Sequence, residues 1–572
     1  MNGSHKTRAM IIVTSLSLLF TALCGRLIQL HVFRHSELSA EASRNREIVV
    51  QRHGRRGEIR DCNGYLLANS QSVRLVCADP SITASNNPAA IAAQLSPLLK
   101  MDVPALMTKL TGPGKYTRIK PKVDEETAQK IRALKLKGII FEDQYLRAYP
   151  HGALASHVVG FVDGGHKGVQ GIESSMNQHL EGVAGYEVIE RDRKGREIRA
   201  LRTEDIEPRD GYHVVLTLDQ VIQHIAETEL EKAMTEFRPQ AGVIIISRPK
   251  TGEILAMSCR PTFDLNNAGA ASADARRNRC ISDVAEPGST FKIVVCSGAL
   301  NEKLIRLSDA FNCESGAWLY AGRILHDAHP YGTLTVEQIL FKSSNIGAAK
   351  IAVLRLGPAR LYEYIRRYGF GKKTGVDLPG EVSGIAHPLA RWNPLSISRI
   401  PMGHEIAATP IQMLCAMNAI CNGGKLMKPY LVKRVVDSTG RVIVEAAPQQ
   451  VGQPISPTTT AAMTVALRRV TTPEGTAPKA AVDGYDAAGK TGTAQKVEGG
   501  QYVNKYYSSF IGYLPSENPE LSILVSLDDP SGGAYYGGSV SGPVFQRVAS
   551  KVVEYLGMLP QKTHPRQMVS AR

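Results

Sequence analysis

The chain of 572 residues predicts an α+β protein with an amino-terminal membrane helix and an antiparallel sheet assembled from distant segments. Three observations support this. One apolar run of spanning length lies near the amino terminus, a helix and a β-hairpin are expected at 217–258, and two strands and a helix are expected at 508–556. Matching elements at both ends of the carboxy-terminal region favour one sheet, with the helical residues between them packed as a second lobe.

The apolar run AMIIVTSLSLLFTALCG covers residues 9–25, follows Lys6 and Arg8, and continues to Phe33. Its length is that of a helix that crosses a bilayer. A cleaved signal peptide is one alternative, but no A-x-A-like site follows the run. A lipoprotein is another, but a bulky leucine stands directly before Cys24, where a small residue is expected.

We therefore predict an uncleaved transmembrane signal-anchor at 9–33 behind a cytoplasmic tail at 1–8. No later stretch has spanning length, so the rest of the chain is expected on one side of the membrane. The basic residues before the run place that side outside the cytoplasmic (inner) membrane, in the periplasm. A tail at 558–572 is expected to follow the last domain.

The formal charge of +15 raises the question of nucleic-acid binding. The basic residues are scattered and mixed with acidic ones, and no recognition-helix, RNA-binding or zinc-finger pattern accompanies them. We expect no nucleic-acid partner; a solvated surface or attraction to an anionic envelope polymer explains the charge.

The nine cysteines contain no C-x-x-C pair and are odd in number, and several lie in apolar runs, such as Cys296 in IVVCSGAL. This argues against a zinc site and a disulfide framework and favours small buried residues. Pairing of Cys62 with Cys77 is left open by the sequence.

Residues 40–215 are expected to form a mixed α+β domain. Helical spacing recurs at 87–99 and 124–134, and glycine-rich joints separate the elements. The region carries no nucleophile–base constellation, so we predict a non-catalytic pedestal that docks partners.

The domain at 216–557 begins with an expected helix at 220–237, for which Asp219 is a suitable N-cap. Strands are then expected at 241–247 and 253–258, joined by the turn RPKTG.

The end of this domain mirrors its beginning. Strands are expected at 508–514 and 521–527, followed by a helix at 544–556. One face of that helix is apolar: Val544, Phe545, Val548, Ala549, Val552 and Tyr555.

The segment GYDAAGKTGTAQK at 484–496 fits two unrelated active-site patterns. From Gly484 it matches the nucleotide-binding P-loop, which needs a buried strand before it and a helix after it. The preceding APKAAVDGY is no apolar strand, and the glycines after Lys490 leave no room for a helix. We therefore expect no nucleotide. From Lys490 the segment matches the K-T-G-T strand of serine acyltransferases.

The other active-site motifs that accompany the K-T-G-T strand are present earlier in the chain and in the expected order. Ser289 precedes Lys292 by three residues, so a helix that begins at the Pro287-Gly288 break places both side chains on one face. The lysine amine can then take the serine proton, and the helix N-terminus favours a developing oxyanion.

Two further motifs follow. Ser343 and Asn345 offer a hydroxyl and an amide that can pass protons and hold a peptide carbonyl. The last motif, Lys490, Thr491, Gly492 and Thr493, offers a cation and hydroxyls for a carboxylate, and its glycine lets a substrate backbone lie close. Each motif alone is weak, but three in this order are a strong signal.

With these motifs the chain resembles the class B penicillin-binding proteins, the D,D-transpeptidases of peptidoglycan synthesis. The resemblance extends to GRRGEIRDCNGYLLANS, RAYPHGALASHVVGFV, GIES, TPIQM and YYGGSVSGPVF. The last stretch, with YVNKYYSSFIGYLP, is most similar to the division-specific FtsI type. The resemblance implies a penicillin-binding transpeptidase fold, with a five-stranded antiparallel sheet flanked by helices, and needs no metal or organic cofactor.

The resemblance also implies roles. Ser289 attacks the penultimate D-alanine carbonyl of a stem peptide, with Lys292 as general base, and Ser343 relays the proton to the leaving amine. The N–H groups of Ser289 and Thr493 form the oxyanion hole. Lys490 and Thr491 help anchor the substrate, and the Thr493 hydroxyl holds its carboxylate. A neighbouring stem's amine then resolves the acyl-enzyme, and β-lactams inhibit it.

Implied partners are a SEDS-family glycosyltransferase and other division proteins. The alternatives are a D,D-carboxypeptidase, an elongation-type transpeptidase and a non-catalytic division scaffold. Two positions depart from the family's pattern: Ile293 replaces a proline, which we expect to alter only packing, and Gly403-His404-Glu405 replaces G-x-G. The second departure places an extra carboxylate near the predicted site.

Overall fold

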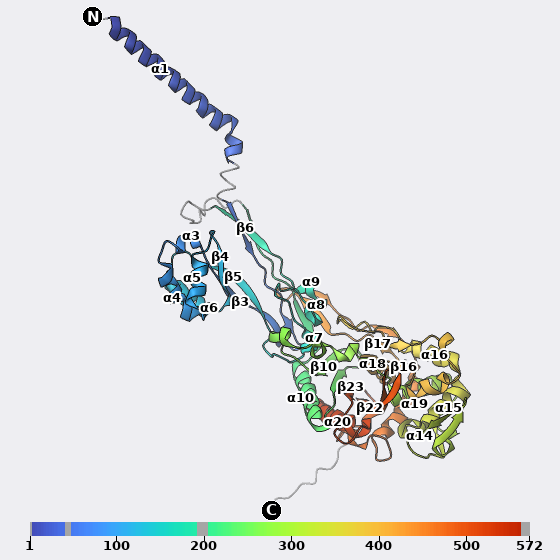
Figure 1. Ribbon diagram of the computed structural model, residues 1–572. Helices are drawn as coiled ribbons and strands as arrows, with labels where there is room; N and C mark the ends of the chain where they lie inside the picture. The colour runs from blue at the N-terminus through green and yellow to red at the C-terminus, as the bar shows by residue number, and fades with distance from the viewer. Residues whose placement is uncertain (1–2, 40–46, 191–203, 562–572) are drawn as a thin grey trace, which may run out of the picture. The chain divides into compact units, whose positions relative to one another are not determined.

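The computed structural model describes residues 3–39, 47–190 and 204–561, which fall into two compact units (Figure 1). Unit 1 contains residues 1–55, 72–145 and 182–210, and unit 2 contains 56–71, 146–181 and 211–572. Parts of the region predicted as a pedestal therefore belong to each unit. The boundary at 215 stays a prediction, and most of the expected tail at 558–572 lies outside the described residues.

The chain begins with α1 (Gly3–Ile28), which continues as a π-helical turn, η1 (Gln29–Phe33). In the part of the chain that the structure describes, His5–Phe33 is the one helix long and apolar enough to cross a membrane. Its bounds match the predicted anchor to within a few residues.

Unit 1 has a small α/β core. Its helices begin where local chemistry predicts: the Asn87 side chain accepts from Ala90 N, and Asp124 accepts from Thr127 N. The strands form a β1–β6–β7 sheet and, separately, β3 paired with β4 and β5. The elements are α3 (Pro80–Thr83), α4 (Pro88–Leu99), α5 (Val103–Leu110), α6 (Glu125–Ala133), β1 (Glu47–Arg52), β3 (Leu66–Ala78), β4 (Thr117–Val123), β5 (Ile139–Ala148), β6 (Gly185–Glu190) and β7 (Glu204–Ile206).

In unit 2, segments 56–71 and 146–181 pack into the same apolar core as the catalytic region. They are held by the fully buried carboxylate of Glu173, which receives hydrogen bonds of 2.6 Å from both Arg56 Nε and Arg147 Nε. The elements are β2 (Ile59–Arg60), α7 (Ser156–Val159), α8 (Gly171–Ser175), α9 (Asn177–Leu180) and β8 (His213–Leu216). β8 lies between β2 and β18 (Val432–Val436), and β19 (Val442–Glu445) follows at the edge.

The predicted central sheet is present, with the order β10-β9-β23-β22-β21 and antiparallel pairing throughout. Its strands are β9 (Ala241–Ser247), β10 (Ile254–Arg260), β21 (Ala488–Glu498), β22 (Gln501–Leu514) and β23 (Leu521–Asp528). Alternate residues enter different clusters: Ile244 and Ile246 on one face, Val243 and Ile245 on the other. The sheet is thus buried on both faces.

The first of these faces is covered by α10 (Gln220–Phe237) and α20 (Gly537–Tyr555) (Figure 1). Asp219 caps α10 as predicted, because its carboxylate accepts from Val221 N and Ile222 N. The predicted apolar face of α20 is buried except for Tyr555, which is 41% exposed and donates to Asp219 Oδ2.

The other face supports the predicted helical lobe, which also contains short strand pairs. Its helices are η3 (Leu265–Ala270), α11 (Ala273–Arg276), α12 (Arg279–Ser282), η4 (Gly288–Phe291), α13 (Lys292–Asn301), η5 (Glu314–Gly316), α14 (Val336–Lys342), α15 (Asn345–Ile351), η6 (Ala352–Leu356), α16 (Pro358–Arg367), η7 (Leu389–Arg391), α17 (Ser396–Arg399), η8 (Ile400–Met402), α18 (Pro410–Cys421) and α19 (Pro457–Arg468). Two short turns, η9 (Arg469–Thr471) and η10 (Pro478–Ala480), instead add Val470 and Ala480 to the core of the first face. The strands are β11 (Ala310–Asn312), β12 (Ala317–Tyr320), β13 (Arg323–His326), β14 (Thr333–Thr335), β15 (Ile385–Ala386), β16 (Ile406–Ala407), β17 (Leu426–Met427) and β20 (Gln450–Gly452).

Candidate active site

Ser289 lies in the 3₁₀ turn η4, and α13 begins at Lys292. The Pro287-Gly288 break predicts an α-helix that begins there; in the structure a 3₁₀ turn comes first. In that geometry residues i and i+3 eclipse each other, which places Lys292 Nζ 2.7 Å from Ser289 Oγ. Phe291 and Ile293 are fully buried and fix the turn in the core, so the isoleucine at position 293 acts in packing, as expected.

Ser343 and Asn345 reach the same lysine from the junction of α14 and α15. Ser343 has a left-handed backbone (φ 63°), and Ser344 caps α15 by accepting from Gly347 N. This turn directs three acceptors at Lys292 Nζ: Ser343 O at 2.8 Å, Asn345 Oδ1 at 2.7 Å and Ser343 Oγ at 3.2 Å.

The contacts of Lys292 suit an amine that can act as a base. Ser343 O and Asn345 Oδ1 can only accept, and the Asn345 amide is oriented because its Nδ2 donates to His326 O. A neutral amine can donate its two N–H groups to these two acceptors and turn its lone pair to Ser289 Oγ, which is the arrangement that a base needs. Burial lowers the pKa of Lys292 to about 7, against the opposing effect of the Asp327 charge.

Lys490 is the second fully buried amine of the site. Burial and the neighbouring Lys292 both lower the pKa of Lys490 well below its ordinary value. Its Nζ has three acceptors, Ser343 Oγ at 2.8 Å, Thr491 O at 3.1 Å and Thr491 Oγ1 at 3.4 Å, which match the three donors of an ammonium group. Ser343 Oγ therefore lies between the two amines, 3.2 Å from Lys292 Nζ and 2.8 Å from Lys490 Nζ.

The K-T-G-T motif lies on strand β21, where its remaining residues follow Lys490. The Thr491 hydroxyl is 3.0 Å from Thr476 Oγ1. The Thr493 hydroxyl oxygen accepts from Gly537 N at 3.0 Å, which leaves its own hydrogen for another acceptor. The structure thus gathers all eight predicted site residues into one constellation.

Gly492 has a role that the sequence did not show. A Cβ at this position would lie 2.4 Å from Ser509 Oγ and 3.2 Å from Pro287 O. Gly288, on the turn of the nucleophile, is equally close to the strand, since its Cβ would lie 3.1 Å from Ala494 Cβ. The glycines therefore let the Ser289 turn pack directly against β21.

The Gly403-His404-Glu405 departure lies beside this turn. Glu405 does not aim its carboxylate at Ser289: it accepts from Ser396 Oγ at 2.6 Å and pairs with Arg399 at 3.3 Å. His404 Nδ1 instead lies 2.8 Å from the carboxylate of Glu286, three residues before the nucleophile.

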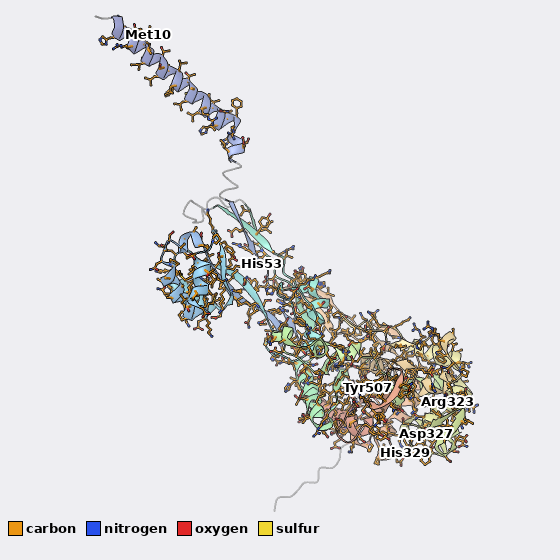
Figure 2. All side chains as sticks on the ribbon, in the orientation of Figure 1. Met10, His53, Arg323, Asp327, His329 and Tyr507 are labelled. Carbon is orange, nitrogen blue, oxygen red and sulfur yellow. The ribbon has the colours of Figure 1, made fainter. Side chains whose placement is uncertain are left out.

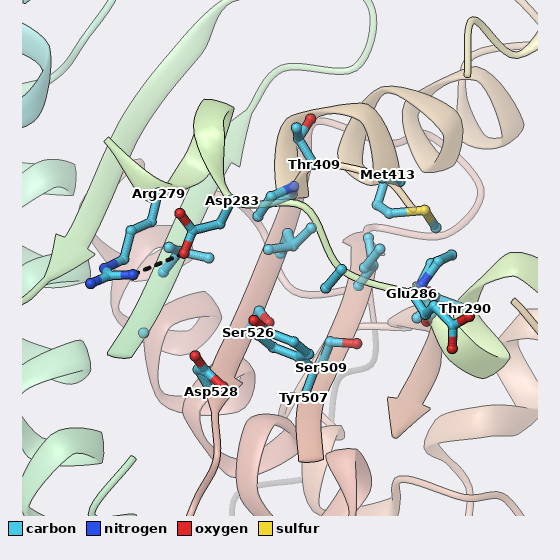
Figure 3. A pocket seen from close by; sticks show the side chains of 18 of the residues that line it. Arg279, Asp283, Glu286, Thr290, Thr409, Met413, Tyr507, Ser509, Ser526 and Asp528 are labelled. Carbon is cyan, nitrogen blue, oxygen red and sulfur yellow. Dashed lines mark hydrogen bonds and ion pairs between the residues drawn. The ribbon is translucent and has the colours of Figure 1, made fainter. Parts of the chain in front are cut away.

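A hollow of about 650 Å³, including its open mouth, lies between the segment 286–290 and the central sheet (Figure 3). Figure 3 shows Tyr507, Ser509 and Ser526 projecting from the sheet and Thr290 at its rim. The hollow forms because small residues, Ser509 and Ser526, stand opposite each other on β22 and β23. Ser289, Lys292, Ser343 and Lys490 do not line it, whereas Pro287 and Thr290, on either side of the nucleophile, do.

Two family models match the chain: the penicillin binding protein transpeptidase domain at residues 242–550 and the penicillin-binding protein dimerisation domain at 51–216. The probable peptidoglycan D,D-transpeptidase PenA of Neisseria meningitidis is 33% identical over 97% of this chain and 94% of its own length. The chain belongs to the class B penicillin-binding proteins.

Other members of this class are similar to the chain over most of its length. The peptidoglycan D,D-transpeptidase FtsI of Escherichia coli is 30% identical over 94% of this chain and 90% of its own length. The crystal structure of penicillin-binding protein 3 of Mycobacterium tuberculosis with aztreonam has a TM-score of 0.70, with 27% identity over 90% of this chain and 98% of that one. The predicted family, fold class and serine-transpeptidase activity of this class B penicillin-binding protein are confirmed.

Proposed function

We propose that this transpeptidase cross-links peptidoglycan stem peptides through an acyl-enzyme on Ser289, with Lys292 as general base. The carrying observation is the position of Lys292 Nζ, 2.7 Å from Ser289 Oγ and within hydrogen-bond distance of Ser343 O and Asn345 Oδ1, where a neutral amine can accept the serine proton. A lysine whose pKa burial lowers to about 7 suits this role, since a base is most effective near the working pH.

In acylation, Ser289 Oγ bonds to the penultimate D-alanine carbonyl carbon while its proton passes to Lys292 Nζ. The carbonyl electron pair moves to the oxygen, which the N–H groups of Ser289 and Thr493 stabilise. Ser343, placed between both lysines, relays the proton to the leaving nitrogen. As the C–N bond breaks, terminal D-alanine departs and the acyl-enzyme remains.

The K-T-G-T strand supplies substrate binding. Lys490 provides positive charge beside the oxyanion site, and Thr491 orients that charge. The Thr493 hydroxyl has a free hydrogen for the substrate carboxylate, because its oxygen already accepts from Gly537 N. The amine of a neighbouring stem then attacks the acyl-enzyme and forms the cross-link.

The cellular setting belongs to the same proposal. The helix at 9–33 anchors the chain in the cytoplasmic membrane with the catalytic unit on the outer side, and the basic flank at Lys6 and Arg8 supports this orientation. Residues 40–215 dock a SEDS-family glycosyltransferase and other division proteins, and residues 216–557 carry the chemistry. The similarity to FtsI supports a septal role.

Labelling with a fluorescent penicillin tests the proposal. The full-length protein in detergent should label covalently, Ser289→Ala should not, and Ser438→Ala, in an exposed turn, should label like the parent. Release of D-alanine from a pentapeptide, with and without an acceptor amine, separates the transpeptidase from a carboxypeptidase. Labelling of Ser289→Ala at the parent rate would refute the proposal.

A further inference from the structure

Asp327 is an acidic residue next to the catalytic constellation that none of the motifs contains. It follows the hairpin of β12 and β13, and Figure 2 labels it with Arg323 and His329 on the helical lobe. One carboxylate oxygen accepts from Ser344 Oγ at 2.6 Å. The other accepts from Ile346 N at 3.0 Å and from the backbone N–H of Asn345.

These contacts place Asp327 directly behind the Ser343–Asn345 turn. The backbone and the hydroxyl of this turn bind the carboxylate, and the Asn345 side chain donates to the carbonyl of His326 at 3.0 Å. The adjacent residues His326 and Asp327 therefore hold both the main chain and the amide of Asn345. That amide and Ser343 O are the two acceptors that orient Lys292.

We propose that Asp327 is a positioning residue for acyl transfer, which holds the Ser343–Asn345 turn against Lys292 and stabilises the positive charge that this lysine gains from the Ser289 proton. The inference rests on the proposed function, in which Lys292 is the base. In this role no proton passes through Asp327.

The charged groups near Lys292 determine whether Asp327 raises or lowers the pKa of this lysine. The charged and titratable groups that act on the amine are Asp327 behind the turn, the neighbouring amine of Lys490 and the thiol of Cys296. Burial lowers the pKa of Lys292, and the negative charge of Asp327 raises it. An anion in this place therefore opposes the repulsion by Lys490 at the moment when Lys292 becomes charged.

If Asp327 only capped the short helix α15, the structure would be the same, but the pH dependence of the acylation rate would differ. Asp327→Asn keeps the shape and an acceptor for the two backbone N–H groups while it removes the charge. Ser344→Ala removes one hydrogen bond to the carboxylate and leaves the charge in place. Glu314→Gln is the matched control, because Glu314 is an acid of the same lobe that pairs with Lys350 at 2.6 Å.

The experiment measures the second-order rate constant for acylation of the full-length protein by a fluorescent penicillin between about pH 5 and 9. In the parent the rate should rise through a midpoint that follows the pKa of Lys292. Asp327→Asn should move this midpoint to lower pH by about half a unit or more, and slow the plateau by roughly tenfold. Ser344→Ala should slow acylation without moving the midpoint, and Glu314→Gln should change neither.

A folded Asp327→Asn variant whose midpoint matches the parent or lies at higher pH would overturn the inference, and so would an equal shift in Glu314→Gln. A thermal melt and circular dichroism establish that each variant is folded; if Asp327→Asn is not, Asp327→Glu, which keeps the charge, must retain the parent midpoint. Failure of the proposed function has a different signature: Lys292→Met would then acylate at the parent rate.

Discussion

Gly492 faces Thr290 so closely that a Cβ at position 492 would lie 2.9 Å from Thr290 Cγ2. The same atom would lie 2.4 Å from Ser509 Oγ and 3.2 Å from Pro287 O, so a methyl group there requires the Ser509 and Thr290 side chains to move. Glycine at position 492 therefore lets the strand that binds substrate and the turn that carries the nucleophile pack together without moving these two side chains.

We expect Gly492→Ala to push the Ser289 turn away from β21. Overpacking of this kind costs about 1–3 kcal/mol of stability, and displaced oxyanion donors should slow penicillin acylation by roughly a hundredfold. Thermal melts and acylation kinetics measure both effects. Gly269→Ala is the control, because nothing lies within 4 Å of its Cβ position; equal behaviour of the two variants would contradict the packing role.

Lys490 should serve acylation rather than nucleotide binding. Lys490→Ala removes the ammonium group that donates to Ser343 at 2.8 Å, so labelling by penicillin should slow by orders of magnitude. ATP should leave the melting temperature of the parent unchanged. Saturable ATP binding that is lost in Lys490→Ala would restore the P-loop interpretation.

The acylation rate of the parent should depend on pH with a midpoint near neutrality. Lys292 acts as a base only when it is neutral, and burial lowers its pKa from 10.5 to about 7. The rate should therefore be low below this pKa, rise as pH increases through it, and level off above it. Stopped-flow or gel-based kinetics across the range measure this; a rate that falls between pH 6 and 8 contradicts the assignment of Lys292.

The sequence allowed the motif residues, the anchor and the sheet elements to be predicted, because each depends on local periodicity or on a short pattern. The 3₁₀ turn at Ser289 was not predictable, since tertiary packing of Phe291 and Ile293 selects it over an α-helical turn. Asp327 was missed for a similar reason. It lies 18 residues from Asn345 and reaches it only through the fold of the β12–β13 hairpin.

The packing of the pedestal also depends on distant pairing. Segments 56–71 and 146–181 lie within the dimerisation-domain match at 51–216, and their buried side chains join the core of unit 2. Pairing across long sequence separations decides this, and a single sequence does not show it.

This division predicts how a deletion should behave. Removal of residues 74–143 with a short glycine–serine link between the paired strands β3 and β5 should keep penicillin labelling, because the core of unit 2 is intact. The same protein should lose co-purification of the glycosyltransferase from membranes. Deletion of 40–215 should abolish labelling, since it removes Arg56, Arg147 and Glu173. Full retention of the partner by the shorter deletion would show that docking lies elsewhere.

Intact-mass spectrometry of the penicillin-treated protein over an hour tests the central claim most directly. One adduct should form, map to the peptide that contains Ser289 and persist for minutes or longer, because a retained β-lactam fragment obstructs the acceptor amine and the carboxylate of Glu405 is held by Ser396 and Arg399. Glu405→Gln should leave the lifetime of the adduct unchanged. Absence of an adduct, an adduct at another residue, or rapid loss that Glu405→Gln prevents would contradict a transpeptidase that acts through Ser289.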